Sequence, residues 1–282
     1  MRAVRSPQHL VVDGLGVTRF PLDPSGAETA DQPVVIIVPG AMDRAGGFRR
    51  AIRHLGDLDV VAYDRRGYAT SIGLGTSDDL ADHVDDLIRI IDHVGAPAVV
   101  VGHSQGALIA LHAAVRISTH SVDAPADLRA VRAVGAWEPP LPWFGWYDET
   151  AHPAVSDACS GGATPSEIAE RFMRSVISDR LWDRLPRSMQ DERLEEGPAL
   201  VADIRSARRA GAVLAFDAIT LPVVVGYGTD TSPQHRRSAQ MVADEVAGAE
   251  LVVVEGATHG VHLTHASEFA RFVRTTVRAA GR

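Results

Sequence analysis

The chain of 282 residues has one cysteine, no excess of basic charge and no long apolar run, and each of these shortages excludes a class of protein. Cys159 is the only cysteine, so no disulfide can form within the chain and a thiolate metal centre lacks ligands. The formal net charge of −8 disfavours binding to nucleic acid phosphates or anionic lipid. Nowhere do about 18 apolar residues run together, and the first residues lack the apolar core of a signal peptide. We therefore expect a cytoplasmic protein without a nucleic acid partner or a membrane attachment; the sequence leaves its oligomeric state open.

Hydrophobic residues make up 45% of the chain and charged residues 23%, which is typical of a soluble globular domain. Short β-branched runs alternate with longer helical patterns, and this alternation predicts an α/β fold with a mostly parallel sheet. Because the apolar runs are continuous, we expect strands covered on both faces. An antiparallel pair near the start is expected to extend the sheet at one edge. The expected parallel strands span residues 34–38, 59–64, 98–102, 130–137, 222–228 and 250–256.

Two segments show the apolar periodicity of helices that pack on a sheet, one over 80–94 and one around Phe269, Phe272 and Val273. The alternation of strands and helices stops after residue 138, where several helical stretches follow. One of them begins with Thr164-Pro165-Ser166-Glu167, a capping box with proline at the first helical position. The sequence therefore predicts an inserted helical cap. Its expected bounds are 139–220, and those of the core are 1–138 and 221–282.

A serine lies between two glycines in Gly-His-Ser-Gln-Gly, residues 102–106. A β-branched run precedes it and a buried helical pattern follows it, which is the strand, tight turn and helix of a nucleophile elbow. Side chains at 102 and 106 would collide with neighbouring backbone in such a turn, so glycine is required there. The pattern predicts that Ser104 is exposed near the positive N-terminus of a helix. A buried turn serine bonded to its own backbone is the alternative.

Four separated motifs together resemble the α/β-hydrolase superfamily, and the resemblance covers nearly the whole chain. The motifs are VVIIVPGAMDRAGGF, VVAYDRRGYATS, VVVGHSQGALIA and VVVEGATHGVHLTHASEFARF. The resemblance implies a central, mostly parallel sheet flanked by helices, with a helical cap inserted after the strand that follows the nucleophile helix. It also implies catalysis by a serine, a histidine and an acid, without a cofactor.

A serine hydroxyl is a poor nucleophile at neutral pH and needs a base. The resemblance assigns that base to His259 in Gly-Ala-Thr-His-Gly, after the last strand. His262 and His265 follow at a spacing that suggests a metal site, but no carboxylate or cysteine ligands accompany them in a known pattern, and we expect no metal. His103 is expected to pack beside the elbow.

The acid that orients the histidine has two candidates. The common family arrangement places it after the penultimate strand, where Asp230 lies one residue before the expected register at Thr231. A second arrangement in the superfamily places a glutamate after the strand that follows the nucleophile helix, and Glu138 occupies that position. Two prolines follow Glu138 and fix the chain as it leaves the sheet. We favour Glu138, with Asp230 as the alternative.

The resemblance also assigns the two backbone N–H groups that bind an oxyanion, those of Ala41 and Gln105. Pro39 stands where the family most often has histidine, which leaves the Gly40 turn and the Ala41 N–H intact. We interpret the charged turn Asp64-Arg65-Arg66-Gly67 as structural, because charges in such turns more often tie loops together than contact substrate.

These assignments predict hydrolysis of a carboxylic ester or lactone through an acyl-enzyme. A tryptophan-rich stretch at the end of the fourth parallel run favours either core packing or an apolar pocket for a bulky substrate, and the sequence leaves both open. Thioester or carbon–carbon hydrolysis and a hydrolase-like small-molecule binding protein are the alternative functions. The expected substrate contacts are Met42, Trp137, Trp143 and Trp146.

Overall fold

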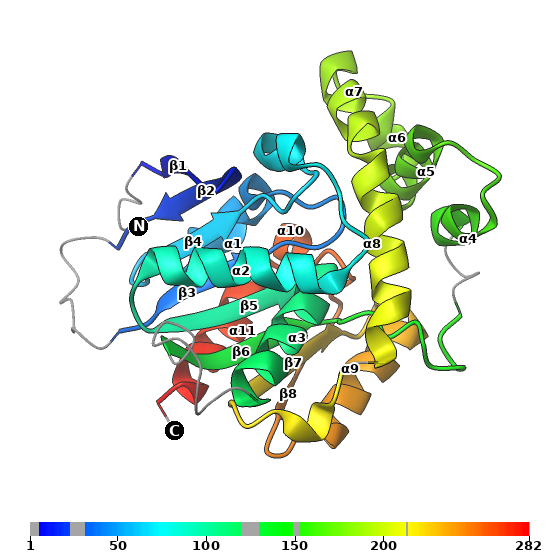
Figure 1. Ribbon diagram of the computed structural model, residues 1–282. Coiled ribbons are helices and arrows are strands. Elements are labelled where there is room, and N and C mark those ends of the chain that lie inside the picture. Colours follow the sequence, from blue (N-terminus) through cyan, green and yellow to red (C-terminus); the bar gives the residue numbers. More distant parts are fainter. Residues whose placement is uncertain (1–5, 23–31, 120–129, 149–152, 213, 282) are drawn as a thin grey trace.

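In the computed structural model, one twisted sheet is covered by helices on both faces (Figure 1). The structure describes residues 6–22, 32–119, 130–148, 153–212 and 214–281. Within them the sheet has eight strands in the order β1-β2-β4-β3-β5-β6-β7-β8. The strands are β1 (Gln8–Val12), β2 (Leu15–Phe20), β3 (Val34–Val38), β4 (Val60–Tyr63), β5 (Ala98–His103), β6 (Val131–Trp137), β7 (Val223–Gly228) and β8 (Glu250–Val254).

The pairing confirms the predicted α/β-hydrolase fold. β1 pairs with β2 and β2 with β4 in antiparallel fashion, and every other neighbouring pair is parallel. β5 lies between β3 and β6, and its register puts Gly102 beside Val38 and Ala136. The carboxyl ends of β3, β5 and β6 therefore meet at one edge of the sheet, which is where open α/β sheets place their ligands.

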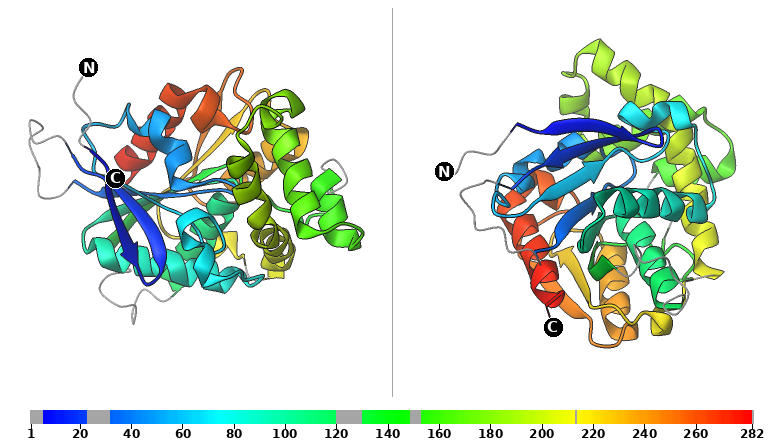
Figure 2. Two further views of the ribbon diagram at one scale, coloured as in Figure 1. Left: turned by 90° about the horizontal axis from the view of Figure 1, so that it is seen from above. Right: turned by 60° about the vertical axis from the view of Figure 1, so that its left-hand side comes forward.

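Two hydrophobic clusters fill the space between the sheet and its flanking helices. Figure 2 shows the two helical layers on opposite faces of the sheet. One layer consists of α2 (Leu80–Val94), α3 (Gln105–Thr119) and α9 (Pro233–Glu245). The other consists of the short helices η1 (Ala45–Phe48), α1 (Arg49–Ile52) and α10 (Val261–Thr264) together with α11 (Ala266–Ala279).

Between β6 and β7 the chain forms helices that stand together at one end of the sheet (Figures 1 and 2). The predicted capping box is present, since the Thr164 hydroxyl accepts from the Glu167 N–H and the Glu167 carboxylate accepts from the Thr164 N–H. These helices have a third hydrophobic cluster, to which the rest of the chain contributes Ala41, Met42 and Tyr68. They are α4 (Pro153–Ser160), α5 (Pro165–Ile177), α6 (Asp179–Trp182), α7 (Arg187–Glu195) and α8 (Gly197–Arg209). Shorter 3-10 turns complete the described structure: η2 (Ala69–Leu74), η5 (Ala210–Ala212) and η6 (Phe216–Ala218).

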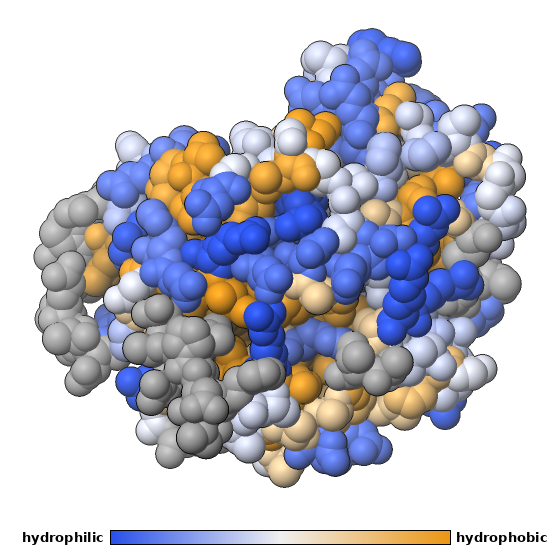
Figure 3. Space-filling view, in the orientation of Figure 1, coloured by the Kyte–Doolittle hydropathy of each residue, from blue (hydrophilic) through white to orange (hydrophobic). Residues whose placement is uncertain are grey.

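Two details are not evident from the sequence pattern. Asp86 of α2 is only 1% exposed, and its carboxylate binds Arg66. Leu251 and Val253 of β8 are exposed because β8 is an edge strand and one of its faces is left uncovered. The surface over α2 is mainly hydrophilic (Figure 3). No helix among the described residues is long and apolar enough to span a membrane.

Candidate active site

Ser104 lies at the apex of a tight turn between β5 and α3. Its φ of +53° is in the left-handed region, which non-glycine residues rarely adopt. A Cβ on Gly102 would lie 2.2 Å from the Gly106 carbonyl oxygen, and one on Gly106 would lie 2.0 Å from the Val38 oxygen. Both glycines are therefore required by close backbone contact, as the sequence predicts. The Ser104 N–H donates to the Trp137 oxygen at 2.8 Å, which ties the turn to the end of β6.

Glu138 leaves the end of β6 with a φ of +47°, and its side chain is fully buried. The Gly228 N–H donates to its Oε1 at 2.9 Å, and the Thr231 hydroxyl donates to its Oε2 at 2.8 Å. His259 Nδ1 lies 2.5 Å from the same Oε2. The structure thus brings Glu138 and His259 together from positions 121 residues apart in the sequence.

The electrostatics of this pair keep the carboxylate ionised. Burial raises the pKa of Glu138, but the hydrogen bond and charge of His259, the charge of His235 and the Gly228 N–H outweigh burial and lower that pKa to about 2. A carboxylate with such a pKa is an acceptor at neutral pH, so His259 Nδ1 must be the donor.

Asp230, the alternative acid, lies elsewhere. Its side chain is exposed, and its Oδ1 lies 3.5 Å from the hydroxyl of the neighbouring Thr229. Among the described residues, no hydrogen bond or ion pair joins Asp230 to His259. Thr231, at the register where the common family arrangement has its acid, is buried and donates to Glu138 instead.

The loop after β3 packs directly against the elbow. A Cβ on Gly40 would lie 3.1 Å from the Ser104 Cβ, so the absence of a side chain at 40 lets this loop approach the serine. Ala41 follows in that loop and is partly exposed, while Gln105 is the first residue of α3. Both residues assigned to oxyanion binding therefore flank Ser104.

Comparison with known proteins agrees with the fold. Residues 35–272 match the family model described as "Alpha/beta hydrolase family". The chain belongs to this family. It is 26% identical over 211 residues to the pimeloyl-[acyl-carrier protein] methyl ester esterase of Neisseria meningitidis serogroup B, covering 71% of this chain and 75% of that protein.

Solved structures share the α/β-hydrolase fold over nearly the full chain. The enol-lactonase from Burkholderia xenovorans LB400 is 17% identical, with a TM-score of 0.62 over 96% of this chain and 100% of that chain. A lipase-esterase related protein from Clostridium acetobutylicum ATCC 824 is 14% identical, with a TM-score of 0.68 over 93% of this chain and 99% of that chain. At these identities the likeness shows the fold alone.

Two histidines of this α/β-hydrolase acquire contacts that sequence reasoning missed. His235 of α9 stacks on the His259 ring, with 4.2 Å between ring centroids and 12° between ring planes. Its Nδ1 lies 3.0 Å from the hydroxyl of Ser232, the residue that caps α9. The spacing Ser-Pro-Gln-His indicates a helix start, but nothing in it indicates contact with a residue beyond the next strand.

His103 does more than pack beside the elbow. Its Nδ1 lies 2.9 Å from Asp43 Oδ2 and its Nε2 lies 2.8 Å from the backbone oxygen of His259. Both partners accept hydrogen bonds, so the geometry fits the doubly protonated ring. Burial lowers the pKa of His103, but the hydrogen bond and charge of Asp43 outweigh burial and raise it. His103 thereby links the loop after β3 to the backbone of His259.

The histidine series at 259, 262 and 265 does not converge on one point. His259 faces Glu138, His262 Nε2 lies 3.5 Å from Asp43, and His265 Nδ1 lies 3.0 Å from the Thr264 hydroxyl. Two clusters of described residues do bring three donor atoms within 4.8 Å of one another. In each cluster a carboxylate lies at hydrogen-bond distance from a histidine nitrogen, so shared protons account for the contact. The clusters are Asp43, His103 and His262, and Glu138, His235 and His259.

The tryptophans expected at the substrate separate into two groups. Trp137 is fully buried in the core, and its ring packs edge-to-face on that of Phe272 of α11, with 5.3 Å between ring centroids. The expectation that Trp137 contacts the substrate is therefore wrong, and its ring is part of the core. Its position on β6 points the ring toward the α11 face. Trp143 and Trp146 are partly buried against the cluster on the opposite face, and the Arg237 guanidinium lies 4.6 Å from the Trp146 ring. Met42 lies in the loop after β3 and is buried in the third cluster.

Proposed function

We propose that this protein is a serine hydrolase that cleaves a carboxylic ester or lactone of an apolar substrate through an acyl-enzyme. The observation that carries the proposal is the 2.5 Å contact between His259 Nδ1 and the buried Glu138 carboxylate, at the sheet edge where the elbow presents Ser104. A histidine that donates from Nδ1 to a carboxylate keeps its lone pair at Nε2, where it can accept a proton.

In the first half-reaction, Ser104 Oγ attacks the carbonyl carbon while its proton passes to His259 Nε2. The new C–O bond moves the carbonyl electron pair to oxygen, and the N–H groups of Ala41 and Gln105 bind that oxyanion. When the pair returns, the bond to the leaving alcohol breaks and His259 gives the alcohol its proton. The ionised Glu138 stabilises the imidazolium during both transfers.

In the second half-reaction, water takes the place of the alcohol. His259 accepts a proton from water, the hydroxide attacks the acyl carbon, and collapse of the second tetrahedral intermediate returns the proton to Ser104. For a lactone the alcohol and acid remain one molecule, and the balance is the same. Each step uses only groups of this chain, the substrate and water.

The substrate class has its own support. Met42 is apolar and follows Ala41 in the loop after β3, and it packs into the cluster of the inserted helices. Two of the proteins compared above have names that specify a methyl ester or a lactone. We also propose that residues 139–220 form a cap over a core of 1–138 and 221–282, because the inserted helices have a hydrophobic cluster of their own.

The test is intact-protein mass after incubation with a fluorophosphonate, followed by assays on p-nitrophenyl esters and lactones of increasing size. The wild type and Ser267→Ala, an exposed serine on α11, are expected to gain one adduct and to turn over the panel. Ser104→Ala is expected to do neither. A wild type that gains no adduct would instead favour a binding protein. Turnover of thioesters alone, or of carbon–carbon substrates alone, would keep the nucleophile and refute the ester assignment.

A further inference from the structure

Arg65, in the turn after β4, is one of the most buried charged side chains of the described structure, at 1% exposed. Its Nε donates to the Pro39 oxygen at 2.8 Å, and its Nη2 donates to the Gly40 oxygen at 3.0 Å. The Gly40 carbonyl and the Ala41 N–H belong to the same planar peptide group. Arg65 therefore binds the back of the peptide whose N–H is assigned to the oxyanion.

This placement affects both direction and strength of the Ala41 donor. In a trans peptide the C=O and N–H bonds point in opposite directions, so a group that fixes the Gly40 oxygen also fixes the Ala41 N–H. A guanidinium on the oxygen draws electron density toward it and makes the opposite N–H a stronger donor, because hydrogen bonds in a chain polarise one another.

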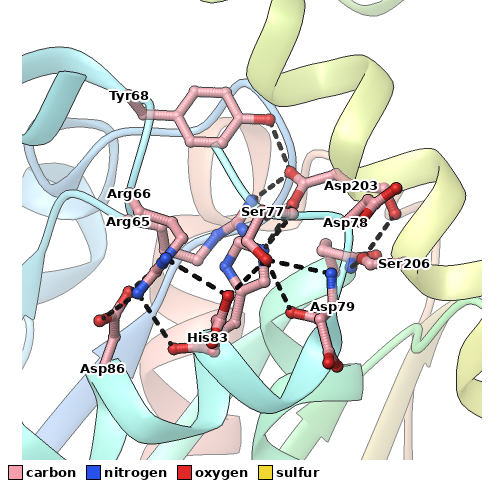
Figure 4. Close-up of polar contacts among 12 residues, drawn as sticks. Arg65, Arg66, Tyr68, Ser77, Asp78, Asp79, His83, Asp86, Asp203 and Ser206 are labelled. Atoms are coloured by element: carbon pink, nitrogen blue, oxygen red, sulfur yellow. Dashed lines mark hydrogen bonds and ion pairs between the residues drawn. The ribbon is translucent and has the colours of Figure 1, made fainter. Parts of the chain in front are cut away.

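The arginine is itself held by the inserted helix α8. Asp203 accepts from Arg65 Nη1 at 2.9 Å and from Nη2 at 2.6 Å, and it also accepts from the Tyr68 hydroxyl at 2.6 Å. Figure 4 shows Arg65 and Tyr68 pointing at Asp203 on α8. Burial raises the pKa of Asp203, but the charge of Arg65 and its hydrogen bonds outweigh burial and lower it, so the pair stays ionised.

The same face of α8 also reaches the second assigned donor. Ser206 lies three residues after Asp203, which places it one turn on and on the same side of the helix. Its hydroxyl accepts from Gln105 Nε2 at 3.1 Å and donates to the backbone oxygen of Asp203 at 2.9 Å. Gln105 supplies the other N–H assigned to the oxyanion. One turn of α8 thus contacts Gln105 directly and reaches the Gly40–Ala41 peptide through Arg65.

We propose that Asp203, Arg65 and Ser206 are positioning residues through which helix α8 sets the two oxyanion donors. Asp203 and Arg65 act on the Gly40–Ala41 peptide, and Ser206 acts on Gln105. The proposal rests on the proposed function for the roles of Ala41 and Gln105. It gives the inserted helices a part in the chemistry itself in addition to covering the site.

The chain offers a matched control for docking of the inserted helices. Glu196, at the start of α8, is also 1% exposed, and its carboxylate accepts from Arg44 at 2.9 Å and from the Ala69 N–H at 2.8 Å. It joins the inserted helices to the rest of the chain through an ion pair with an arginine, as Asp203 does. Its partners reach the loop after β3 only beyond Ala41, since Arg44 lies in that loop and Arg193 donates both to Glu196 and to the Met42 oxygen, each at 3.0 Å. Glu196 itself makes no hydrogen bond or ion pair with Pro39, Gly40, Ala41 or Gln105 among the described residues.

The experiment compares Asp203→Asn, Ser206→Ala and Glu196→Gln by melting temperature, kcat and KM on the best ester of the panel. We expect Asp203→Asn to lower kcat about 10-fold or more with KM within about 2-fold, since losing one oxyanion donor outright costs about 10²- to 10³-fold in kcat. Ser206→Ala, which removes one hydroxyl, is expected to lower kcat less. Asp203→Glu is expected to recover part of the loss. Glu196→Gln is expected to lower the melting temperature without lowering kcat.

A second readout does not depend on catalysis. The amide NMR signals of Ala41 and Gln105, observed with ¹⁵N-labelled alanine and glutamine, are expected to shift in Asp203→Asn and to shift less in Glu196→Gln, whose partner Arg193 reaches only the Met42 oxygen. If the wild type hydrolyses no ester, the proposed function fails and these shifts still decide the positioning claim. If Asp203→Asn fails to fold, Ser206→Ala decides it through the Gln105 signal and kcat. Equal kcat losses in Asp203→Asn and Glu196→Gln, or unshifted Ala41 and Gln105 signals, would overturn the proposal.

Discussion

Replacing Glu138 by glutamine tests the assigned triad with a change of few atoms. The amide keeps one oxygen, which the Gly228 N–H can still reach, and it puts an NH₂ group where Oε2 accepts from Thr231 and His259. An NH₂ group is a donor, so His259 Nδ1 must become an acceptor and the ring proton moves to Nε2. In that tautomer the histidine cannot take the proton of Ser104.

Two losses set the magnitude. The variant lacks the ionised carboxylate, whose pKa is lowered to about 2 and which would stabilise the imidazolium. The ring also holds the wrong tautomer, and acid-to-amide replacement in a serine triad lowers kcat by about 10⁴-fold. We expect a loss of that size in Glu138→Gln, about 5 kcal/mol in activation free energy.

The assay is kcat and kcat/KM on the preferred ester between pH 6 and 9, for Glu138→Gln and for Asp230→Asn as the control. The tautomer argument predicts that no pH in this range restores Glu138→Gln, because the amide does not titrate. Asp230→Asn is expected to stay within about 2-fold of wild type, as exposed substitutions usually have small effects. An active Glu138→Gln together with an inactive Asp230→Asn would refute the assignment.

Two further predictions concern folding. Gly106→Ala would place its Cβ 2.0 Å from the Val38 oxygen, so the elbow must shift. We expect loss of soluble protein, or a free energy of unfolding in urea that is lower by about 3 kcal/mol or more. The control Gly46→Ala, whose Cβ meets no atom within 4 Å, should lower it far less. The second prediction concerns the pair of His103, whose pKa is raised, and Asp43, whose pKa is lowered. The pairing stabilises the fold fully at a pH above the ordinary pKa of aspartate and below the ordinary pKa of histidine. The stabilisation is lost as pH rises through the folded pKa of His103, or as pH falls through the folded pKa of Asp43. The difference in melting temperature between the wild type and His103→Gln, which keeps His259 and His262, should therefore become smaller from pH 6 to pH 9. A difference that becomes larger would contradict the pairing.

Much of the fold follows from local pattern. Continuous β-branched runs become strands because a parallel sheet covered on both faces selects such residues, and β3 matches its expected bounds of 34–38. The glycines at 102 and 106 could be interpreted from sequence because the requirement is steric and local. Glu138 could be proposed because the resemblance offers an arrangement with a glutamate after this strand, and the two prolines that follow it supported that choice; the structure places its side chain against His259.

The rest depends on which distant side chains meet. Asp203 belongs to an amphipathic helix, and nothing in its own segment distinguishes it from a surface carboxylate until Arg65, 138 residues away, is placed beside it. Trp137 could face either side of the sheet, and the register of β6 decides in favour of the α11 side. His235 reaches His259 because α9 begins beside the loop that carries Thr231, a matter of helix docking that no periodicity reveals.

The left-handed backbone at Ser104 and Glu138 has a consequence for engineering. A non-glycine residue at positive φ costs about 1 to 3 kcal/mol, so glycine would relax the backbone at both positions. The assigned chemistry needs a hydroxyl at one and a carboxylate at the other. Selection for thermal stability therefore favours glycine at these two positions, whereas selection for turnover excludes it. A library of variants screened for thermal stability alone would be enriched in inactive variants.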